Sequence, residues 1–393
     1  MEFYPWMLAR MPELTGIRRD LHRHPELSNR EYQTAEYIEQ HLDQWGIPHE
    51  RVGQTGVYAE IRGARGEGRT VALRADIDAL PIQEENDVPY RSECPGVMHA
   101  CGHDMHTASL LAAAQALQAH REDFAGTVRV IFQPAEEVGG GVRAFVEAGK
   151  MKGVDRVFGI HSAPDLKLGT VGVKTGSNNA SVDCFKVKIH GKASHVSTPQ
   201  MGADALYAAA QTIVALQALV TRRTSPVDAV LIGVGKLNAG MAYNIVAEEA
   251  SFEGTTRLFT QELRQQVNGW VTETVKSIAA MYGTEAEIEW EDYGSPLVNP
   301  EEICREVRPV VEAMLGADAV ITDRALSCCG DNFADFQLEA PGVYAYVGVC
   351  SPDTPGSEGP LHNSHYTVDE RALPIGAALY AQMAWEWLTD KKN

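Results

Sequence analysis

The sequence predicts an α/β protein whose main domain has a mostly parallel sheet covered by helices and is interrupted by a smaller domain. Two observations predict this fold. Short apolar segments alternate with helical segments before residue 177 and again after residue 293, which is typical of a parallel sheet with helices on both faces. Between these two parts, strands of alternating polarity accompany two long helical segments.

The elements of the main domain alternate along the chain. A helical pattern over residues 12–46 ends at Gly46, and a second one over residues 105–120 is rich in strong helix formers. The other elements are short apolar strands and the helices between them: strands over 70–76, 127–133, 156–162 and 342–349, and helices over 140–150, 300–315 and from about 368. We assign residues 1–177 and 293–393 to this domain.

The inserted domain, residues 178–292, contains four predicted strands and two predicted helices. Its strands span 181–191, 229–237, 244–258 and 285–292, and its helices span about 202–220 and 260–281. The order β-α-β-β-α-β is the split βαβ arrangement of a ferredoxin-like sheet. A segment of about 110 residues is long enough to form a domain of its own.

The composition excludes several classes of protein. The 393-residue chain has a formal net charge of −19, which argues against binding to nucleic acids or to anionic membranes. The opening residues do not resemble a secretion signal, and no apolar run has membrane-spanning length. Seven scattered cysteines do not read as a disulfide framework. We therefore expect a reduced, cytoplasmic protein.

Polar side chains follow the strands of the main domain where these strands end. In an open parallel sheet, ligands bind beyond the carboxyl ends of the strands, so we expect these side chains to meet at one edge. Five segments supply them: Asp76 with Asp78, Glu136 with Glu137, His161, the group Cys101, His103 and Asp104, and the pair His362 and His365. This convergence indicates a functional site.

The segment over residues 97–106 has the most specific pattern. His99, Cys101 and His103 are two residues apart, so in an extended segment all three side chains can face one ion. The spacing does not match that of a zinc finger. A nucleophilic cysteine with His103 or His106 as its base is the alternative. We favour a metal ligand, because nearby carboxylates raise the pKa of a thiol whereas a bound metal deprotonates it.

Two adjacent glutamates, Glu136 and Glu137, follow the strand over residues 127–133. Adjacent residues at a strand end point in different directions, so one carboxylate can bind a metal while the other faces a substrate. A hydrolytic metal site needs this division, because a carboxylate that is not a ligand takes the proton of the attacking water. Two solvated glutamates before a glycine-rich turn are the simpler interpretation of this motif taken alone.

Five motifs, taken in order, resemble those of the M20 metallopeptidase family and most closely its amidohydrolase branch: DIDALP, MHACGHDMHTASLL, PAEE, GIHSAP and LHNSHY. This branch includes hippurate hydrolases, N-acyl-amino-acid aminoacylases and auxin-conjugate hydrolases. The opening segment IRRDLHRHPELSNREYQTAEYI is similar to the start of the same branch. The resemblance covers essentially the whole chain.

The resemblance implies a centre with two divalent ions, whose identity as manganese, zinc or cobalt stays open. The implied ligands are Cys101, His103, Glu137, His161 and His362, with Cys101 as a bridge between the ions. Glu136 matches the general base and acid of the family.

Other polar residues near these motifs have weaker assignments. Asp78 and Asp104 match family aspartates near the metals, and we interpret them as groups that orient histidine ligands. The histidines beside ligand positions, His99, His106 and His365, are left unassigned. His22 and His24 are interpreted as helix-surface or packing residues.

The resemblance also implies that the inserted domain is a lid and dimerisation domain, so that the protein is a homodimer or a higher homo-oligomer. His195 matches a histidine that polarises the scissile carbonyl, and Asn244 and Arg257 match substrate-binding residues. The guanidinium of Arg257 suits a carboxylate because it donates two parallel hydrogen bonds. A surface loop histidine and a surface salt bridge are the simpler interpretations of His195 and Arg257.

One late segment, SCCGDNFADF, departs from the family pattern. Asp331 and Phe333 keep part of the usual run, whereas Cys328 and Cys329 are unexpected. We interpret the segment as bordering the substrate pocket, and packing is the simpler role of the two cysteines.

These inferences predict hydrolysis of the amide bond that joins an acyl or aryl-acyl group to an amino acid. A dipeptidase and an N-acetyl-amino-acid deacetylase are alternatives with the same chemistry, because only the pocket distinguishes their substrates. A metal-containing scaffold that binds amino-acid conjugates without cleaving them is the alternative from another class. Retention of every implied ligand argues against the scaffold.

Overall fold

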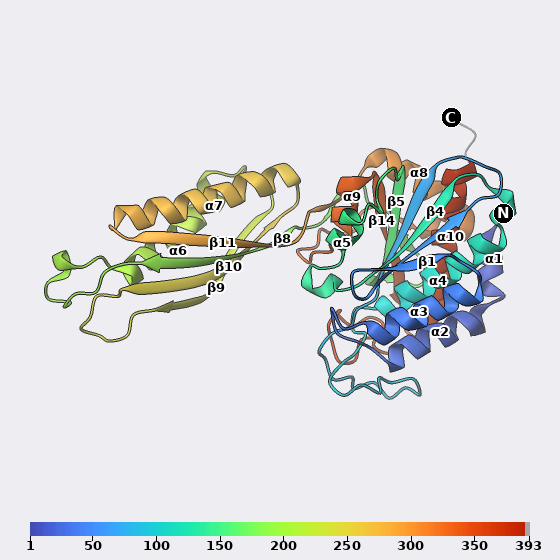
Figure 1. Ribbon diagram of the computed structural model, residues 1–393, viewed down its shortest axis with the longest axis horizontal. Coiled ribbons are helices and arrows are strands. Elements are labelled where there is room, and N and C mark those ends of the chain that lie inside the picture. The colour runs from blue at the N-terminus through green and yellow to red at the C-terminus, as the bar shows by residue number, and fades with distance from the viewer. Residues whose placement is uncertain (390–393) are drawn as a thin grey trace. The chain divides into compact units, whose positions relative to one another are not determined.

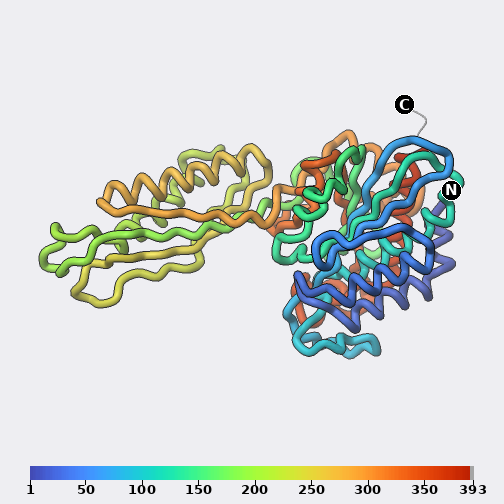
Figure 2. Tube along the Cα trace, viewed as in Figure 1, coloured from blue at the N-terminus to red at the C-terminus, as the bar shows by residue number. Residues whose placement is uncertain are grey.

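The computed structural model describes residues 1–389, and the chain forms two compact units (Figures 1 and 2). Unit 1 comprises Met1–Gly176, Asn299–Ala325 and the chain from Asn332 onward, and unit 2 comprises Ser177–Val298 and Leu326–Asp331. The sequence pattern instead predicts that residues 326–331 belong to the main domain. Backbone pairing explains the difference, because the Ser327 N–H donates to Asn178 O at 3.0 Å and the Ala180 N–H donates to Ser327 O at 2.9 Å.

Unit 1 is built on an eight-stranded sheet with the order β1-β2-β4-β3-β5-β14-β6-β13. Its strands are β1 (His49–Val52), β2 (Gly56–Arg62), β3 (Thr70–Asp76), β4 (Thr127–Gln133), β5 (Arg156–Lys167), β6 (Val171–Gly172), β13 (Val320–Ile321) and β14 (Gly342–Cys350). The central strands β4, β3, β5 and β14 are parallel. On one side β2 and β1 continue the sheet by antiparallel pairing, and on the other β6 is antiparallel to β14 and parallel to β13. The predicted mostly parallel sheet is confirmed.

Helices cover the sheet of unit 1 and bury its central strands (Figure 1). Every residue of β3 after Thr70 is buried, as expected of a parallel strand with both faces covered. The helix α4 packs on β3 and is itself buried along most of its length. The helices of this unit are α1 (Phe3–Leu8), α2 (Met11–Arg23), α3 (Tyr32–Gln44), α4 (His103–Ala119), α5 (Val142–Glu147), α8 (Glu301–Leu315), α9 (Phe333–Glu339) and α10 (Leu373–Thr389).

Several elements of unit 1 differ from those expected. The helical pattern over 12–46 forms two helices, α2 and α3, because Pro25 lies between them and a proline has no backbone N–H to continue a helix. The short antiparallel strands β1 and β2 were not predicted. The last helix starts at Leu373, after a 3-10 turn over Glu370–Ala372, and not near residue 368.

Unit 2 contains one four-stranded antiparallel sheet with the order β11-β8-β10-β9 and two helices on one of its faces (Figure 1). Its elements follow in the predicted order: β8 (Val182–His190), α6 (Ala205–Arg222), β9 (Val230–Ala239), β10 (Glu249–Leu258), α7 (Gln261–Met281) and β11 (Glu285–Gly294). The strand β10 begins five residues later than expected from the pattern over 244–258. The strands β7 (Gly176–Asn179) and β12 (Leu297–Asn299) form a separate two-stranded sheet.

Side-chain alternation and helix caps explain why the sequence forms unit 2. On β8, Phe185, Val187 and Ile189 are buried in an apolar core under α6 and α7, while the residues between them are more exposed. Both helices begin at a residue whose side chain accepts a hydrogen bond from the first turn: Asp204 from the Tyr207 N–H at 3.0 Å and Thr260 from the Leu263 N–H at 3.2 Å.

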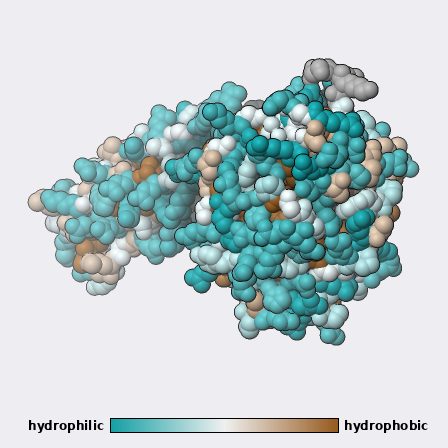
Figure 3. Space-filling model, turned by 45° about the vertical axis from the view of Figure 1, so that its right-hand side comes forward, coloured by the Kyte–Doolittle hydropathy of each residue, from teal (hydrophilic) through white to brown (hydrophobic). Residues whose placement is uncertain are grey.

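The face of the molecule in Figure 3 is mostly hydrophilic, in keeping with the acidic composition. Among residues 1–389, none of the helices combines the length and the hydropathy that crossing a membrane requires.

Candidate metal centre

The candidate centre lies in unit 1, beside the central strands of its sheet. Glu136 and Glu137 open a 3-10 turn just after β4, and His103 is the first residue of α4. His161 lies inside β5, because this strand runs to Lys167 and does not end at residue 162 as predicted. Gly102, directly before α4, has a φ of 86°, and a Cβ at this position would lie 2.6 Å from Ser162 Oγ. Only glycine fits here, because it adopts a left-handed conformation and allows the close approach.

Cys101 is shared by two compact groups of potential ligands. In the first group, ligand atoms of Cys101, His103 and His161 lie within 4.8 Å of one another; in the second, those of Cys101, Glu137 and His362 do. The Cys101 Sγ is 3.5 Å from His161 Nε2, and Glu137 Oε2 is 3.3 Å from His362 Nε2. Two groups that share one thiol have the donor types and the spacing of a centre for two neighbouring ions.

Glu136 lies beside these groups, since one atom each of His103, Glu136 and Glu137 form a further set within 4.8 Å. The structure therefore brings together the five predicted ligands and the predicted general base. His362 approaches from a loop, with an uncommon φ of 61°, whereas Cys101 and His103 are buried.

The hydrogen bonds of the histidines leave one nitrogen of each ring directed to the centre. His103 Nδ1 donates to the backbone O of Asp78 at 2.9 Å, and His161 Nδ1 donates to the backbone O of Ser162 at 2.7 Å. These bonds place the lone pair on Nε2 of each ring. The buried atoms His103 Nε2 and Glu137 Oε1 have no hydrogen-bond partner among residues 1–389. Buried polar atoms are normally paired, so a metal fits this site.

Burial and neighbouring charges shift the titration of the cluster. Burial, with Glu137 as the next contribution, raises the pKa of the Cys101 thiol well above its usual value. Burial and the nearby His106 lower the pKa of His161 well below its usual value. Burial also opposes protonation of His103, but Asp76 and Cys101 outweigh it and raise that pKa. A divalent cation would favour the thiolate and displace the proton of His103.

Asp76 and His106 form a compact group with His103 but are occupied by other bonds. His106 Nδ1 donates to Asp76 Oδ1 at 2.6 Å, and His106 Nε2 accepts the Ser162 N–H at 2.8 Å. The other carboxylate oxygen of Asp76 lies 2.8 Å from Arg74 Nη1. His106, which the sequence analysis left unassigned, thus connects α4 and β3 to the segment beside His161. Its position three residues after His103 was the available signal, because i and i+3 share a helix face.

The two aspartates expected to orient ligands behave differently. Asp78 contacts His103 through its backbone and lies 3.3 Å from the ring through Oδ1. Asp104 points to another part of the unit, where its Oδ2 lies 2.7 Å from Arg18 Nε and 2.8 Å from His22 Nδ1. It follows a ligand in sequence, and successive residues of a helix point in different directions.

The histidines outside the cluster correct two expectations. His22 is not a surface or simple packing residue, since it is buried between Asp104 and Glu84, 3.1 Å from Glu84 Oε1. His99 belongs to none of the ligand groups of the described chain, and burial lowers its pKa to about 4. The pattern that allows His99, Cys101 and His103 to face one ion does not hold for His99, whose ring lies beside that of His22 instead, with ring centroids 6.4 Å apart.

Two further histidines of the sequence motifs, His24 and His365, are exposed. His24 lies on the surface, as expected, and His365 Nε2 is 3.1 Å from Glu85 Oε2.

The three predicted lid residues all belong to unit 2. The exposed His195 accepts the Ser197 N–H on Nδ1 at 3.1 Å, which leaves Nε2 as the donor nitrogen of the neutral ring. Asn244 lies on the neighbouring segment, and the backbone O of Asn244 accepts the Val196 N–H at 3.1 Å. Arg257 lies on β10, and its buried Nη1 has no hydrogen-bond partner among residues 1–389.

The unexpected cysteines also lie in unit 2. Cys328 and Cys329 are exposed thiols within electrostatic range of Arg257. Burial, as the largest contribution, lowers the pKa of the Arg257 guanidinium. Asp331 and Phe333 lie at the point where the chain passes from unit 2 to unit 1, and Phe333 is buried as the first residue of α9.

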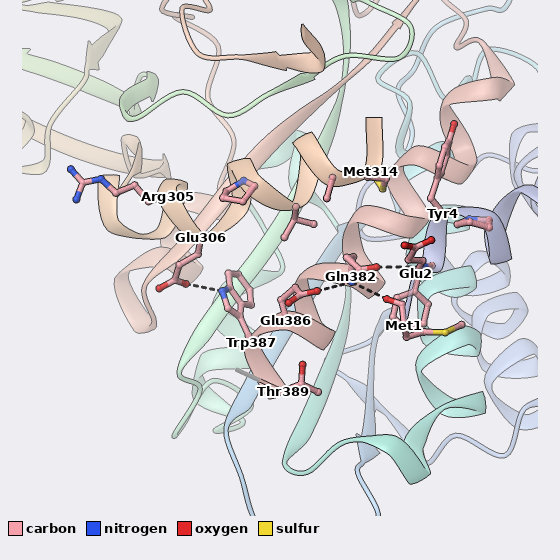
Figure 4. Close-up of a pocket in the computed structure, with 15 residues that line it drawn as sticks. Met1, Glu2, Tyr4, Arg305, Glu306, Met314, Gln382, Glu386, Trp387 and Thr389 are labelled. Carbon is pink, nitrogen blue, oxygen red and sulfur yellow. Dashed lines mark hydrogen bonds between the residues drawn. The ribbon is translucent and has the colours of Figure 1, made fainter. Parts of the chain in front are cut away.

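A cavity of about 730 Å³ lies elsewhere in unit 1, between α1, α8 and α10 (Figure 4). Its polar groups pair with one another: the Trp387 Nε1–H donates to Glu306 at 2.7 Å and the Gln382 amide donates to Glu386 at 2.8 Å. None of the predicted site residues lines it. We therefore place the functional site at the ligand cluster and not at this cavity.

The buried pair of Arg18 and Asp104 gives a stability prediction. Burial opposes ionisation of Asp104, but Arg18 and then His22 outweigh it and hold the pKa of that carboxyl far below its usual value. Replacing Arg18 with methionine should lower the free energy of unfolding by about 3 kcal/mol at neutral pH, because Asp104 loses its main counter-charge. Denaturant titration measures this change.

Arg19 provides the matched control, because it pairs with Glu370 at the surface. Arg19→Met should cost less than about 1 kcal/mol. The loss of unfolding free energy in Arg18→Met should become smaller as the pH falls below about 4. The lowered pKa of Asp104 contributes its full stability only above the pKa of this carboxyl in the unfolded chain, and the contribution is lost as the pH falls further. Equal losses in the two variants would contradict this account.

A metal-assisted hydrolase needs metal ligands and a free carboxylate, and the thiol, imidazoles and carboxylates of this cluster are groups of these kinds. The chain belongs to peptidase family M20/M25/M40, whose family model matches residues 72–386. The predicted membership of the M20 family is thereby confirmed, and the relatives described next support its amidohydrolase branch.

Individual relatives agree in sequence and in fold. The chain is 41% identical to N-acetyl-L-cysteine deacetylase of Bacillus subtilis over 92% of this chain and 85% of that protein. It is 35% identical to an IAA-amino acid hydrolase of Arabidopsis thaliana, ILR1-like 4, over the full chain and 88% of that protein. The crystal structure of a Bacillus subtilis protein described as a dinuclear metal-binding peptidase of the M20 family is 37% identical, with a TM-score of 0.83 over 97% of this chain and 99% of that one.

Proposed function

We propose that this hydrolase contains two divalent metal ions and cleaves the amide bond of N-acyl amino acids, releasing a carboxylic acid and an amino acid. The observation that carries the proposal is the pair of ligand groups that share Cys101, with Glu136 beside them. The relatives named for N-acetylcysteine and for auxin–amino acid conjugates support a substrate with an acyl group on an amino acid.

The two groups assign the ligands. Cys101, His103 and His161 would hold one ion, and Cys101, Glu137 and His362 would hold the other. When bound, two such ions polarise the substrate carbonyl and increase the acidity of water. Thiolate and imidazole ligands favour zinc, and the carboxylates also suit manganese or cobalt.

Glu136 is assigned as the group that moves the proton. Its carboxylate would accept a proton from the attacking water and then donate it to the nitrogen of the leaving amino acid. The turn that begins with Ala135 supports this division of roles, because it brings Glu136 close to the centre without placing it in either Cys101 group.

His195 and Arg257 are assigned to the substrate. The Nε2–H of His195 would donate to the carbonyl oxygen as this oxygen gains charge. Arg257 would bind the carboxylate of the amino acid, with Asn244 as a further polar contact. In support, Asp183, an acidic neighbour of Arg257, is already bound by Arg264, with Asp183 Oδ1 2.7 Å from Arg264 Nη2.

Arg257→Gln should raise KM about 10- to 100-fold for substrates with a free carboxylate, because a charge-assisted hydrogen bond contributes about 1.5–3 kcal/mol. An amino acid amide, which lacks this carboxylate, should lose much less. Steady-state kinetics on the two substrates measures the difference, with Arg223→Gln, an exposed arginine of unit 2 paired with Glu273, as the control. Equal losses for both substrates would contradict the assignment.

Amine release from a panel of N-acetyl-, N-benzoyl- and longer N-acyl-amino acids and dipeptides tests the proposed function. Cleavage that favours N-acyl amino acids supports it, and a preference for dipeptides or for acetyl groups alone identifies the dipeptidase or the deacetylase. Binding of these compounds without cleavage of any would point to the scaffold.

Two properties complete the proposal. We propose a homodimer formed through unit 2, whose edge strand β9 carries the half-exposed Leu231 and Leu237. Molar mass by light scattering tests this assembly. We also propose that the protein works in the cytoplasm, where its seven free cysteines stay reduced.

A further inference from the structure

The segment between α2 and α3, Glu26–Glu31, runs beside the chain that carries the candidate centre. Leu27 pairs with Ala79 in an isolated parallel bridge, and the Ala79 N–H donates to Glu26 O at 2.8 Å. The Ser28 hydroxyl donates to Asp78 Oδ2 at 2.6 Å. Part of the N-terminal motif is thus bonded to the strand-end segment that also orients His103.

Glu31, the last residue of this segment, has a buried and fully bonded carboxylate. Its Oε1 accepts the Ala135 N–H at 2.8 Å and the Asn29 N–H at 2.9 Å, and its Oε2 accepts the Thr55 hydroxyl at 2.7 Å. Glu31 precedes α3 directly, but its side chain makes no capping bond to that helix. One of its three bonds therefore reaches the loop of Glu136, and none of them caps the start of α3.

Ala135 has a backbone conformation that needs such support. Its φ is 58°, in the left-handed region that alanine rarely occupies. The Gly140 N–H closes the turn by donating to Ala135 O at 2.7 Å. A residue stays in this unfavourable region only when several surrounding contacts hold it there. The bond from the Ala135 N–H to Glu31 is one of these contacts.

A second carboxylate holds the other side of the same turn. The Glu137 N–H donates to Asp78 Oδ2 at 3.0 Å, on the oxygen that also accepts the Ser28 hydroxyl. The peptide group before Ala135 is therefore bonded to the carboxylate of Glu31, and the peptide group after Glu136 is bonded to that of Asp78, which also accepts the Ser28 hydroxyl.

We propose that Glu31 is a positioning residue for Glu136: it holds Ala135 in its left-handed conformation and thereby sets the direction of the Glu136 carboxylate. This inference rests on the proposed function, in which Glu136 moves the proton. A misplacement of about 1 Å at a reacting group costs about 100-fold in rate. Glu31 contacts no predicted ligand, so its loss should affect kcat and leave the ions in place.

The test compares Glu31→Ala, Glu31→Gln and Glu26→Ala in the full-length, metal-loaded protein. Glu31→Ala should lower kcat about 100-fold, with KM and metal content within about twofold of the parent protein. Glu31→Gln should retain most activity, because its amide oxygen can accept both N–H groups and its NH₂ can donate to the Thr55 hydroxyl. Glu26 is the matched control, since its carboxylate accepts the Thr34 N–H at 2.8 Å in α3 and has no bond to the loop.

Two further variants distinguish positioning from general damage. Glu31→Asp keeps the charge but withdraws the carboxylate by one methylene, and it should lower kcat in the same way even if Glu31→Ala does not fold. Adding Ala135→Gly to either variant should restore kcat by about tenfold, because glycine adopts the left-handed region without strain.

Hydrogen exchange of a peptide covering residues 134–138 gives a readout that does not depend on activity. Exchange should become faster in Glu31→Ala and stay unchanged in Glu26→Ala. The inference would be overturned if Glu31→Asp and Glu31→Ala both kept the parental kcat. It would also be overturned if exchange of this peptide were unchanged in both of these Glu31 variants. If the parent protein cleaves no amide while exchange responds as expected, the proposed function fails and the role of Glu31 in the loop stands.

Discussion

Glu136→Gln is expected to lower kcat by about 1,000-fold or more while two ions stay bound. Glutamine has nearly the same shape as glutamate but cannot accept a proton, and general acid–base catalysis contributes about 10²–10⁴-fold. Glu136 lies with His103 and Glu137 in one compact set but in neither group that contains Cys101. Steady-state kinetics and elemental analysis of the same sample measure both properties.

The neighbouring glutamate is the contrast to this variant. Glu137→Gln should lose activity together with metal, because Glu137 belongs to a group with Cys101 and His362. Glu147→Gln, an exposed glutamate of α5 paired with Arg143, should change neither. If Glu136→Gln turned over substrate at a near-parental rate, the assignment of Glu136 would be wrong.

Cys101→Ala is expected to remove the metal centre and to lower kcat/KM by more than about 1,000-fold. This effect should be larger than that of any single histidine variant, because Cys101 is common to both ligand groups. The control is Cys304→Ala, which removes another buried thiol of unit 1, outside the ligand groups. It should lower stability and leave metal content unchanged.

Alkylation of Cys101 distinguishes a metal ligand from a nucleophile at this position. Burial and Glu137 raise the pKa of the Cys101 thiol, which disfavours a free thiolate. A ligand should therefore be protected from alkylation by iodoacetamide in the metal-loaded protein and react after the metal is removed. A Cys101→Ala protein that kept two ions and parental turnover would exclude both roles.

The rule that ligands gather at the carboxyl ends of parallel strands predicted the location of the centre. Asp78, Glu136 and Glu137 follow strands, and His103 is the first residue of a helix that was expected to begin two residues later. The rule uses only where strands end, and strand ends are visible in the sequence as the end of an apolar run.

The residues that support the ligand segments without being predicted ligands could not be predicted in this way. Glu31 bonds to Ala135 and His22 bonds to Asp104 across more than 80 positions of the chain. A single polar contact between distant segments leaves no periodic pattern, because each partner looks like a helix-start or helix-surface residue on its own. His99 is only two residues from Cys101, but its ring lies beside that of His22 on α2, a neighbour that the sequence does not reveal.

The proposed substrate contacts of His195, Asn244 and Arg257 are a separate part of the proposal, because all three residues belong to unit 2. Substrate experiments test their roles. The KM effect of Arg257→Gln is the test of that part.

Activity measured against metal content tests the central claim most directly. The metal-stripped protein would be titrated with Mn²⁺, Zn²⁺ or Co²⁺ while hydrolysis of an N-acyl amino acid and bound metal are followed in the same sample. We expect no turnover in the stripped protein and a rise to a plateau at two ions per chain. Full turnover without metal, or none across the substrate panel with two ions bound, would contradict a dinuclear-metal amidohydrolase.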